Sequence, residues 1–129
     1  MKKIDRLFVN ICSNNVSDSK SFYTKLFDFD VQFDSDWFVH LVSKGEKLEL
    51  GIIDRNSDLV PEQYRDNPQG FYLTFVVVDV DAIFEAASQE NLEILAKPEN
   101  TFYGQRRMLL KDPSGALVDI SSPTVHLDE

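Results

Sequence analysis

The sequence predicts an α+β fold made of two modules, each with the order strand, helix, strand, strand, strand. Two segments, 8–15 and 72–79, carry this prediction: each is a strand-like run that ends in Asn or Asp and leads into a helical pattern. A third observation is the polar stretch 56–69, which contains two prolines and separates two halves of similar length.

The length of the chain indicates its domain organisation. At 129 residues, it is long enough to bury one ordinary core without disulfide bonds. We expect a single domain, 1–129, that consists of modules at about 4–55 and 70–122 joined by a linker at 56–69. The polar tail after Pro123, which contains His126, is expected to fray.

The first module begins with a strand at 7–12, in which every second residue is apolar and the residues between are mixed. One face of this strand is therefore expected to pack on a helix, and the other to lie in less dry surroundings. A helix follows at 17–27, because large apolar residues recur there at helical spacing. Three short strands are then expected at 29–33, 37–42 and 47–53.

The second module repeats this order. A strand at 72–78 leads into a helix at 81–90. The remaining strands are expected at 93–96, 105–110 and 116–121, with the turn Asp112-Pro113-Ser114-Gly115 between the last two.

The ends of both helices have candidate stop and start residues. Ser17 or Asn15 can cap the first helix, and Asp79 or Asp81 the second, because a short polar side chain accepts hydrogen bonds from unpaired backbone N–H groups. Asn91 stands where the second helix needs a left-handed residue to end, a conformation that Asn tolerates.

The charge of the chain excludes several classes of partner. The net charge is −9, from 22 acidic and 13 basic residues. A nucleic-acid binder needs a basic surface, and so does a protein that docks on anionic membranes. A neutral or cationic small molecule fits this balance better.

The cysteine content and the apolar runs bear on localisation. Cys12 is the only cysteine, which excludes an intrachain disulfide. Because the sequence shows neither an apolar signal peptide nor an apolar run long enough to span a membrane, we expect a cytoplasmic protein.

Several motifs of the chain occur together in one known family. In order along the chain they are 19–23 (SKSFY), 26–29 (LFDF), 77–81 (VVDVD), 103–106 (YGQR), 112–115 (DPSG) and 117–120 (LVDI). In this order and spacing the chain resembles the vicinal oxygen chelate superfamily: glyoxalase I, extradiol dioxygenases, and bleomycin- and fosfomycin-resistance proteins. The resemblance covers Ile4 to Pro123, and Asp28 stands where the family usually has Gly.

The resemblance implies paired βαβββ modules, a glyoxalase/bleomycin-resistance-like fold. Their eight strands would form an open, cupped mixed sheet with flanking helices around a small-molecule cleft. Many members are dimers, so the resemblance also implies a homodimer.

The resemblance further assigns metal-ligand positions, and two of them have lost their donor. Metal-using members carry a His or Gln at the positions of Phe8 and Tyr72, and a Glu at those of Glu49 and Asp119. Phe8 has no donor atom, and a Tyr phenolate is an uncommon ligand. We therefore expect no metal cofactor; the alternative is a degraded site for Zn, Ni, Mn or Fe that uses Glu49, Asp119, His40 and water.

Strand alternation places a further set of side chains in the implied cleft. The candidate ligand-binding residues are Phe8, Asn10, Trp37, Glu49, Tyr72, Thr74, Tyr103, Arg106 and Asp119, with Cys12 also on this face. Because Arg106 and Arg107 are adjacent on a strand, one of them is expected on the face of the acidic residues. The aromatic residues can equally fill the cleft as core.

The hypothesis that follows is a metal-independent protein that binds a small molecule and sequesters or senses an aromatic or cationic compound. The alternative is a lyase, isomerase or dioxygenase with a reduced metal site, or with Glu49 or Asp119 as a general base. A third hypothesis is a structural or regulatory module whose cleft is filled.

Overall fold

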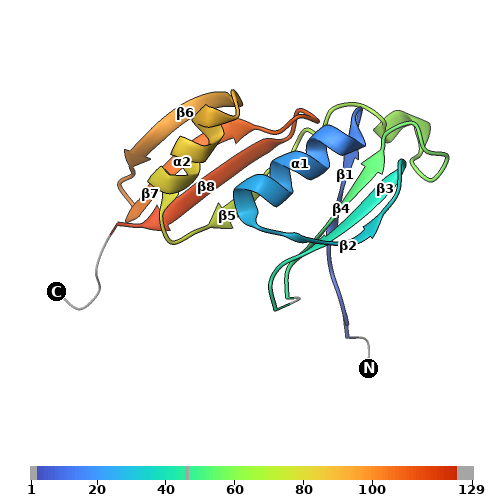
Figure 1. Ribbon diagram of the computed structural model, residues 1–129, viewed down its shortest axis with the longest axis horizontal. Helices are drawn as coiled ribbons and strands as arrows, with labels where there is room; N and C mark the ends of the chain where they lie inside the picture. The colour runs from blue at the N-terminus through green and yellow to red at the C-terminus, as the bar shows by residue number, and fades with distance from the viewer. Residues whose placement is uncertain (1–2, 46, 125–129) are drawn as a thin grey trace. The chain divides into compact units, whose positions relative to one another are not determined.

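The structure is a computed structural model that describes residues 3–45 and 47–124. The predicted tail, with His126, lies outside the described residues. The chain divides into two compact units: unit 1 is Met1–Asn67 and unit 2 is Pro68–Glu129. Each unit contains one α-helix and one four-stranded mixed sheet (Figure 1). The predicted fold class, α+β with two βαβββ modules, is confirmed.

Unit 1 has the sheet order β1-β4-β3-β2, in which β1 and β4 are parallel and the other pairs antiparallel. Its elements are β1 (Val9–Ser13), α1 (Val16–Phe27), β2 (Asp30–Asp34), β3 (Phe38–Val42), β4 (Glu49–Asp54) and the short 3₁₀ helix η1 (Glu62–Tyr64).

Unit 2 repeats the topology with the sheet order β5-β8-β7-β6, and β5 and β8 form its parallel pair. Its elements are β5 (Leu73–Val76), α2 (Val80–Gln89), β6 (Glu93–Asn100), β7 (Gln105–Lys111) and β8 (Leu117–Pro123). In each unit the last strand lies inside the sheet between two partners.

Both helices start at the polar residue that ends the preceding strand run. The Asn15 side chain accepts a hydrogen bond from the Asp18 N–H at 3.0 Å. Asp79 caps α2 in the same way, accepting from the N–H groups of Asp81 at 3.1 Å and Ala82 at 3.3 Å. Each helix therefore begins one residue earlier than the apolar pattern predicted.

Left-handed residues follow the helices. Asp28 has φ 58° at the end of α1, and Asn91 has φ 57° after α2. Asp and Asn reach this region more readily than other residues that carry a Cβ, since their short side chains bond locally. Asp28 therefore serves in the turn where the family usually has Gly, and the prediction for Asn91 is confirmed.

Two strands differ in length from the prediction. β6 continues to Asn100, past Pro98, although the strand was expected only at 93–96. β6 is an edge strand, and its register shifts between Ala96 and Glu99, so the missing N–H of Pro98 falls at a bulge. β5 is shorter than predicted and covers only Leu73–Val76.

The sheet of unit 1 has two unlike faces. Helix α1 packs on β3 and β4, and the face beneath it is largely apolar. Its buried apolar residues are Ile11, Val39, Leu41, Leu50 and Ile52, and the buried Ser13 hydroxyl is hydrogen bonded to that of Ser19 on α1. The opposite face, here called the helix-free face of unit 1, carries Phe8, Asn10, Cys12, His40 and Glu49, of which none is fully buried. The predicted difference between the two faces of β1 is thus confirmed.

Helix α2 covers one face of the unit 2 sheet by packing on β6, β7 and β8. Within the described part of the chain, no helix has the length and apolar character needed to cross a membrane.

Candidate functional site

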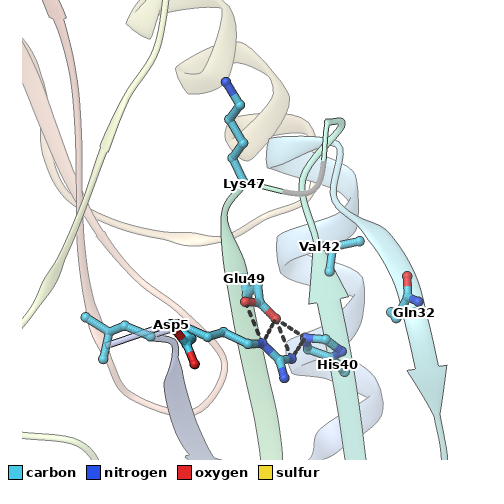
Figure 2. Close-up of a pocket in the computed structure, with 8 residues that line it drawn as sticks. Asp5, Gln32, His40, Val42, Lys47 and Glu49 are labelled. Atoms are coloured by element: carbon cyan, nitrogen blue, oxygen red, sulfur yellow. Dashed lines mark hydrogen bonds and ion pairs between the residues drawn. The ribbon is translucent and has the colours of Figure 1, made fainter. Parts of the chain in front are cut away.

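Three charged or polar side chains meet on the helix-free face of unit 1. The Arg6 guanidinium donates from Nε to both oxygens of Glu49, at 3.0 and 2.9 Å, and from Nη2 to Oε1 at 2.6 Å. The Nε2 atom of His40 lies 2.7 Å from the same Oε1 and 3.2 Å from Arg6 Nη2. Figure 2 shows His40 and Glu49 turned toward each other from neighbouring strands.

The strand register explains why these side chains meet. In the antiparallel pair of β3 and β4, Val42 lies opposite Glu49 and His40 lies opposite Gly51. Residues that lie opposite each other share a face, so His40 and Glu49 are diagonal neighbours on it. Gly51 has no side chain, and its place is taken by the Asn10 amide: a Cβ there would lie 2.1 Å from Asn10 Oδ1.

An aromatic ring closes the cluster. The centroid of the Phe8 ring lies 5.6 Å from that of His40, with the planes tilted by 43°. The Arg6 guanidinium carbon lies over the same ring, 4.9 Å from its centroid, within the range of a cation–π contact. Arg6, Phe8, His40 and Glu49 are together called the Glu49 site below.

The Glu49 site borders a cavity of about 540 Å³, formed entirely by unit 1. Most of its lining is polar: Asp5, Arg6, Leu7, Gln32, His40, Val42, Lys47 and Glu49. Gln32 reaches the cavity from β2 at the point where the register with β3 shifts between Val31 and Phe33 (Figure 2). Such a bulge redirects a side chain, and here it adds an amide to the cavity wall.

The partners of Glu49 determine its charge. The hydrogen bonds from Arg6, with a smaller one from His40, lower the pKa of the Glu49 carboxyl from 4.5 to about 2. The same pair raises the pKa of Arg6 above its ordinary value, chiefly through the hydrogen bond to Glu49. Glu49 is therefore ionised at neutral pH and is a weak base.

This pKa predicts an acid-sensitive contribution to stability. Because the unfolded chain binds a proton on Glu49 near pH 4.5 and the folded chain only near pH 2, the contribution is complete above pH 4.5 and lost as the pH falls toward 2. Urea unfolding of the wild type and of Glu49→Gln over this range measures it. We expect a shallower pH dependence for the variant; equal slopes would contradict the ion pair.

Unit 2 holds the second acidic position, on the face of its sheet away from α2. Thr74 Oγ1 donates to Asp119 Oδ2 at 2.9 Å, and Arg107 Nε donates to Oδ1 at 3.0 Å. Asp119 is 7% exposed. The hydrogen bond to Asp119 raises the pKa of Arg107, and electrostatic interactions with Tyr103 and Tyr72 add to this effect. Asp119, Tyr72 and Tyr103 of the predicted set thus interact with Arg107, and Thr74 joins them through Asp119.

The arginine on this face is Arg107 and not Arg106, which corrects the candidate set. Arg107 pairs with Ser121, two residues along β8 from Asp119, whereas Arg106 pairs with Ser122 on the opposite face. Arg106 donates to both oxygens of Asp81, on α2, at 2.9 and 3.1 Å. Alternation along β7 predicts that the side chains of Arg106 and Arg107 lie on opposite faces of the sheet, but it does not predict which of them shares a face with Asp119.

The remaining predicted aromatic residues are partly exposed. Tyr72 is 50% exposed, Tyr103 54% and Trp37 41%. Trp37 precedes β3 and contacts the Phe38 ring at 5.6 Å between centroids. None of the three is core, so the alternative that they fill a closed interior does not apply to them.

Cys12 shares the helix-free face but is a poor nucleophile. Its thiol is half-buried, and burial raises its pKa above the ordinary value, although the nearby charge of Arg55 partly opposes this. The reactive form of cysteine is the thiolate, so a raised pKa reduces reactivity.

The residues at the family's metal-ligand positions do not fit a metal ion. Phe8 offers no donor atom, and both oxygens of Glu49 accept from Arg6. Asp119 is likewise engaged by Arg107 and Thr74. Among residues 3–45 and 47–124, no group of three or more His, Cys, Asp or Glu side chains lies close enough to bind one.

Arg6 is a residue of this site that was not predicted from the sequence, although a signal for it exists there. Arg6 lies two residues before Phe8, so the alternation that places Phe8 and Asn10 on the helix-free face continues to Arg6. The segment was not assigned to a strand, and the structure indeed shows it outside β1.

Comparison with solved structures shows the same fold in several proteins. One is a glyoxalase/bleomycin resistance protein/dioxygenase family enzyme from Burkholderia phytofirmans PsJN. It is 21% identical to this chain, with a TM-score of 0.77, and the match covers 90% of this chain and 96% of that one. TnmS3, an antibiotic binding protein from Streptomyces sp. CB03234, is 20% identical with a TM-score of 0.72, over 95% and 99%. TioX from Micromonospora sp. ML1 is 14% identical with a TM-score of 0.68, over 95% and 98%.

A comparison of the sequence with curated proteins finds no match. The sequence model of one family, however, matches residues 3–120, almost the whole chain. The motifs that suggested the resemblance, the two βαβββ units and this match agree. The chain belongs to the glyoxalase/bleomycin resistance protein/dioxygenase superfamily.

Proposed function

We propose that this protein binds a small organic molecule, aromatic or cationic, at the Glu49 site without a metal ion. The observation that carries the proposal is an ionised carboxylate on a sheet strand, next to an aromatic ring, at the edge of a cavity of about 540 Å³. Cavities of roughly 300–1,000 Å³ are typical of small-molecule sites. A cavity of this size also argues against the hypothesis of a filled, purely structural module.

The residues at the family's metal-ligand positions in unit 1 support binding without a metal ion. Phe8 replaces an imidazole with an apolar ring, and an arginine engages the carboxylate that remains. The net charge of −9 favours the approach of a cation. The description of TnmS3 as an antibiotic binding protein, at 20% identity, is in keeping with a binding role.

The same geometry disfavours the enzymatic alternative in which Glu49 acts as a general base. An efficient general base has a pKa near the working pH, whereas the pKa of Glu49 is about 2. At neutral pH the carboxylate has little tendency to take a proton from carbon, but it still attracts a cation.

From the family resemblance we also propose that the protein works as a homodimer. Its single cysteine favours the cytoplasm, and its net charge of −9 disfavours a nucleic-acid or membrane partner. Light scattering of the purified chain measures the oligomeric state.

Binding of benzamidinium, which combines a ring with a cation, tests the proposed function. We expect Glu49→Gln to weaken calorimetrically measured binding by about tenfold or more, because a charged hydrogen bond is lost. Asp30→Asn is the matched control, since it removes an equal charge from an exposed position on β2 that pairs only with Lys44 among the described ion pairs. Equal affinity in Glu49→Gln and wild type, or stoichiometric tightly bound divalent metal by elemental analysis, would overturn the proposal.

A further inference from the structure

The members of the Glu49 site differ in how firmly they are held. His40 and Glu49 project from β3 and β4, inside the sheet, and their side chains are each 14% exposed. The Arg6 side chain is 56% exposed and comes from the described segment 3–8, which precedes β1 and pairs with no strand. The carboxylate and imidazole are therefore fixed walls, whereas the guanidinium is attached to the least constrained part of the site.

Arg6 occupies this site as a bound ligand would. Its guanidinium makes a forked hydrogen-bonded contact with one carboxylate and stacks over one aromatic ring. A carboxylate with an aromatic face is the usual combination for binding an organic cation. The cation is supplied here by the chain itself.

The fit of Arg6 against His40 is imperfect. His40 Nε2 lies 2.7 Å from a Glu49 oxygen, which only accepts, and 3.2 Å from Arg6 Nη2, which only donates. If Nε2 carries a proton, it donates to Glu49 and cannot accept from Arg6. If it carries none, it accepts from Arg6 and faces the Glu49 oxygen without a proton between them. Either way one short contact is unsatisfied while Arg6 is in place.

We propose that Arg6 is an internal occupant of a cation site formed by Phe8, His40 and Glu49, and that a small molecule with an amidinium or ammonium group binds there by displacing it. This inference rests on the proposed function and names the chemical class of its ligand. The exchange keeps the charge of the cavity unchanged, because one cation replaces another beside Glu49. An anion would instead meet the carboxylates of Glu49 and Asp5, with Lys47 as the remaining cation of the cavity wall once Arg6 has left.

The test compares benzamidinium affinity in wild type and Arg6→Gln. Removing the competitor is expected to strengthen binding by about threefold to tenfold, in line with a partly exposed, forked ion pair. Lys44→Gln is the matched control: it removes the same charge from the exposed Lys44–Asp30 pair of unit 1, so it reports any general gain in attraction for cations. Benzamide, the neutral analogue of the probe, is expected to bind more weakly than benzamidinium to all three proteins, because it cannot replace the charge of Arg6 beside Glu49.

A second readout follows Arg6 directly in the wild type. The Arg6 Nε–H is hydrogen bonded to Glu49, which separates its NMR signal from that of a solvated arginine. Saturation with benzamidinium is expected to move this signal to the position of a solvated guanidinium.

The outcomes separate the two proposals. Weaker binding in Arg6→Gln, or an Arg6 signal that stays hydrogen bonded at saturation, overturns displacement while leaving the Glu49 site as a binding site. An equal gain in Lys44→Gln overturns it as well, because the effect is then one of overall charge. If Glu49→Gln has no effect on binding, the proposed function itself fails.

Discussion

Replacing Asp112 by alanine is expected to lower the free energy of unfolding by about 3 kcal/mol. Asp112 is 3% exposed, and its Oδ1 accepts from the N–H and hydroxyl of Ser114, at 2.9 and 2.7 Å, and from the N–H of Ala116 at 2.8 Å. Alanine leaves these buried donors without their acceptor, at a cost of about 1 kcal/mol each. Urea unfolding measures the loss.

Asp112→Asn is the matched variant, because asparagine keeps an oxygen at the same place while losing the charge. We expect it to cost less than about 1 kcal/mol. Equal losses in both variants would show that the charge of Asp112, rather than the acceptor in the turn, stabilises the end of β7 and the start of β8.

The second large effect is expected for Arg107→Ala, which should reduce stability by about 2 kcal/mol. The Asp119 side chain is 11% exposed, and Arg107 supplies its only opposite charge among the described ion pairs. Removing one partner of a buried pair costs about 3–5 kcal/mol, and the 30% exposure of Arg107 reduces that figure here.

Arg106→Ala provides the control on the next residue of the same strand. Its partner Asp81 is 53% exposed, so water replaces the lost contact and the effect should be much smaller. In the Asp119→Asn background the cost of Arg107→Ala should shrink, because no unpaired charge remains. Similar losses for the two arginine variants in the wild type would contradict the buried pair.

The order of elements could be predicted because local chemistry decides it. Asn15 and Asp79 cap the helices that their positions suggested, and the alternating run before Asn15 separated a buried from a half-buried face. The extension of β6 past Pro98 could not be predicted, because only the neighbouring strand reveals that Pro98 lies on an edge and at a bulge.

The candidate site was predicted in part for a similar reason. Alternation puts Phe8 and Glu49 on one face but does not show what satisfies the carboxylate. Arg6 reaches Glu49 across 43 residues of sequence, a contact that only the parallel pairing of β1 with β4 creates. From the sequence, His40 was expected as a site residue only in the alternative of a degraded metal site; it is half-buried, and its Nε2 atom lies 2.7 Å from a Glu49 oxygen.

The position of β4 between β1 and β3 has a consequence for how the binding site could change in evolution. Glu49 is carried by a strand that is hydrogen bonded on both sides, so its backbone has little freedom to follow a new ligand. Arg6 belongs to a segment outside the ladder. Substitutions there can change which molecules compete for the carboxylate while the sheet stays intact, so selectivity and foldability can evolve almost independently.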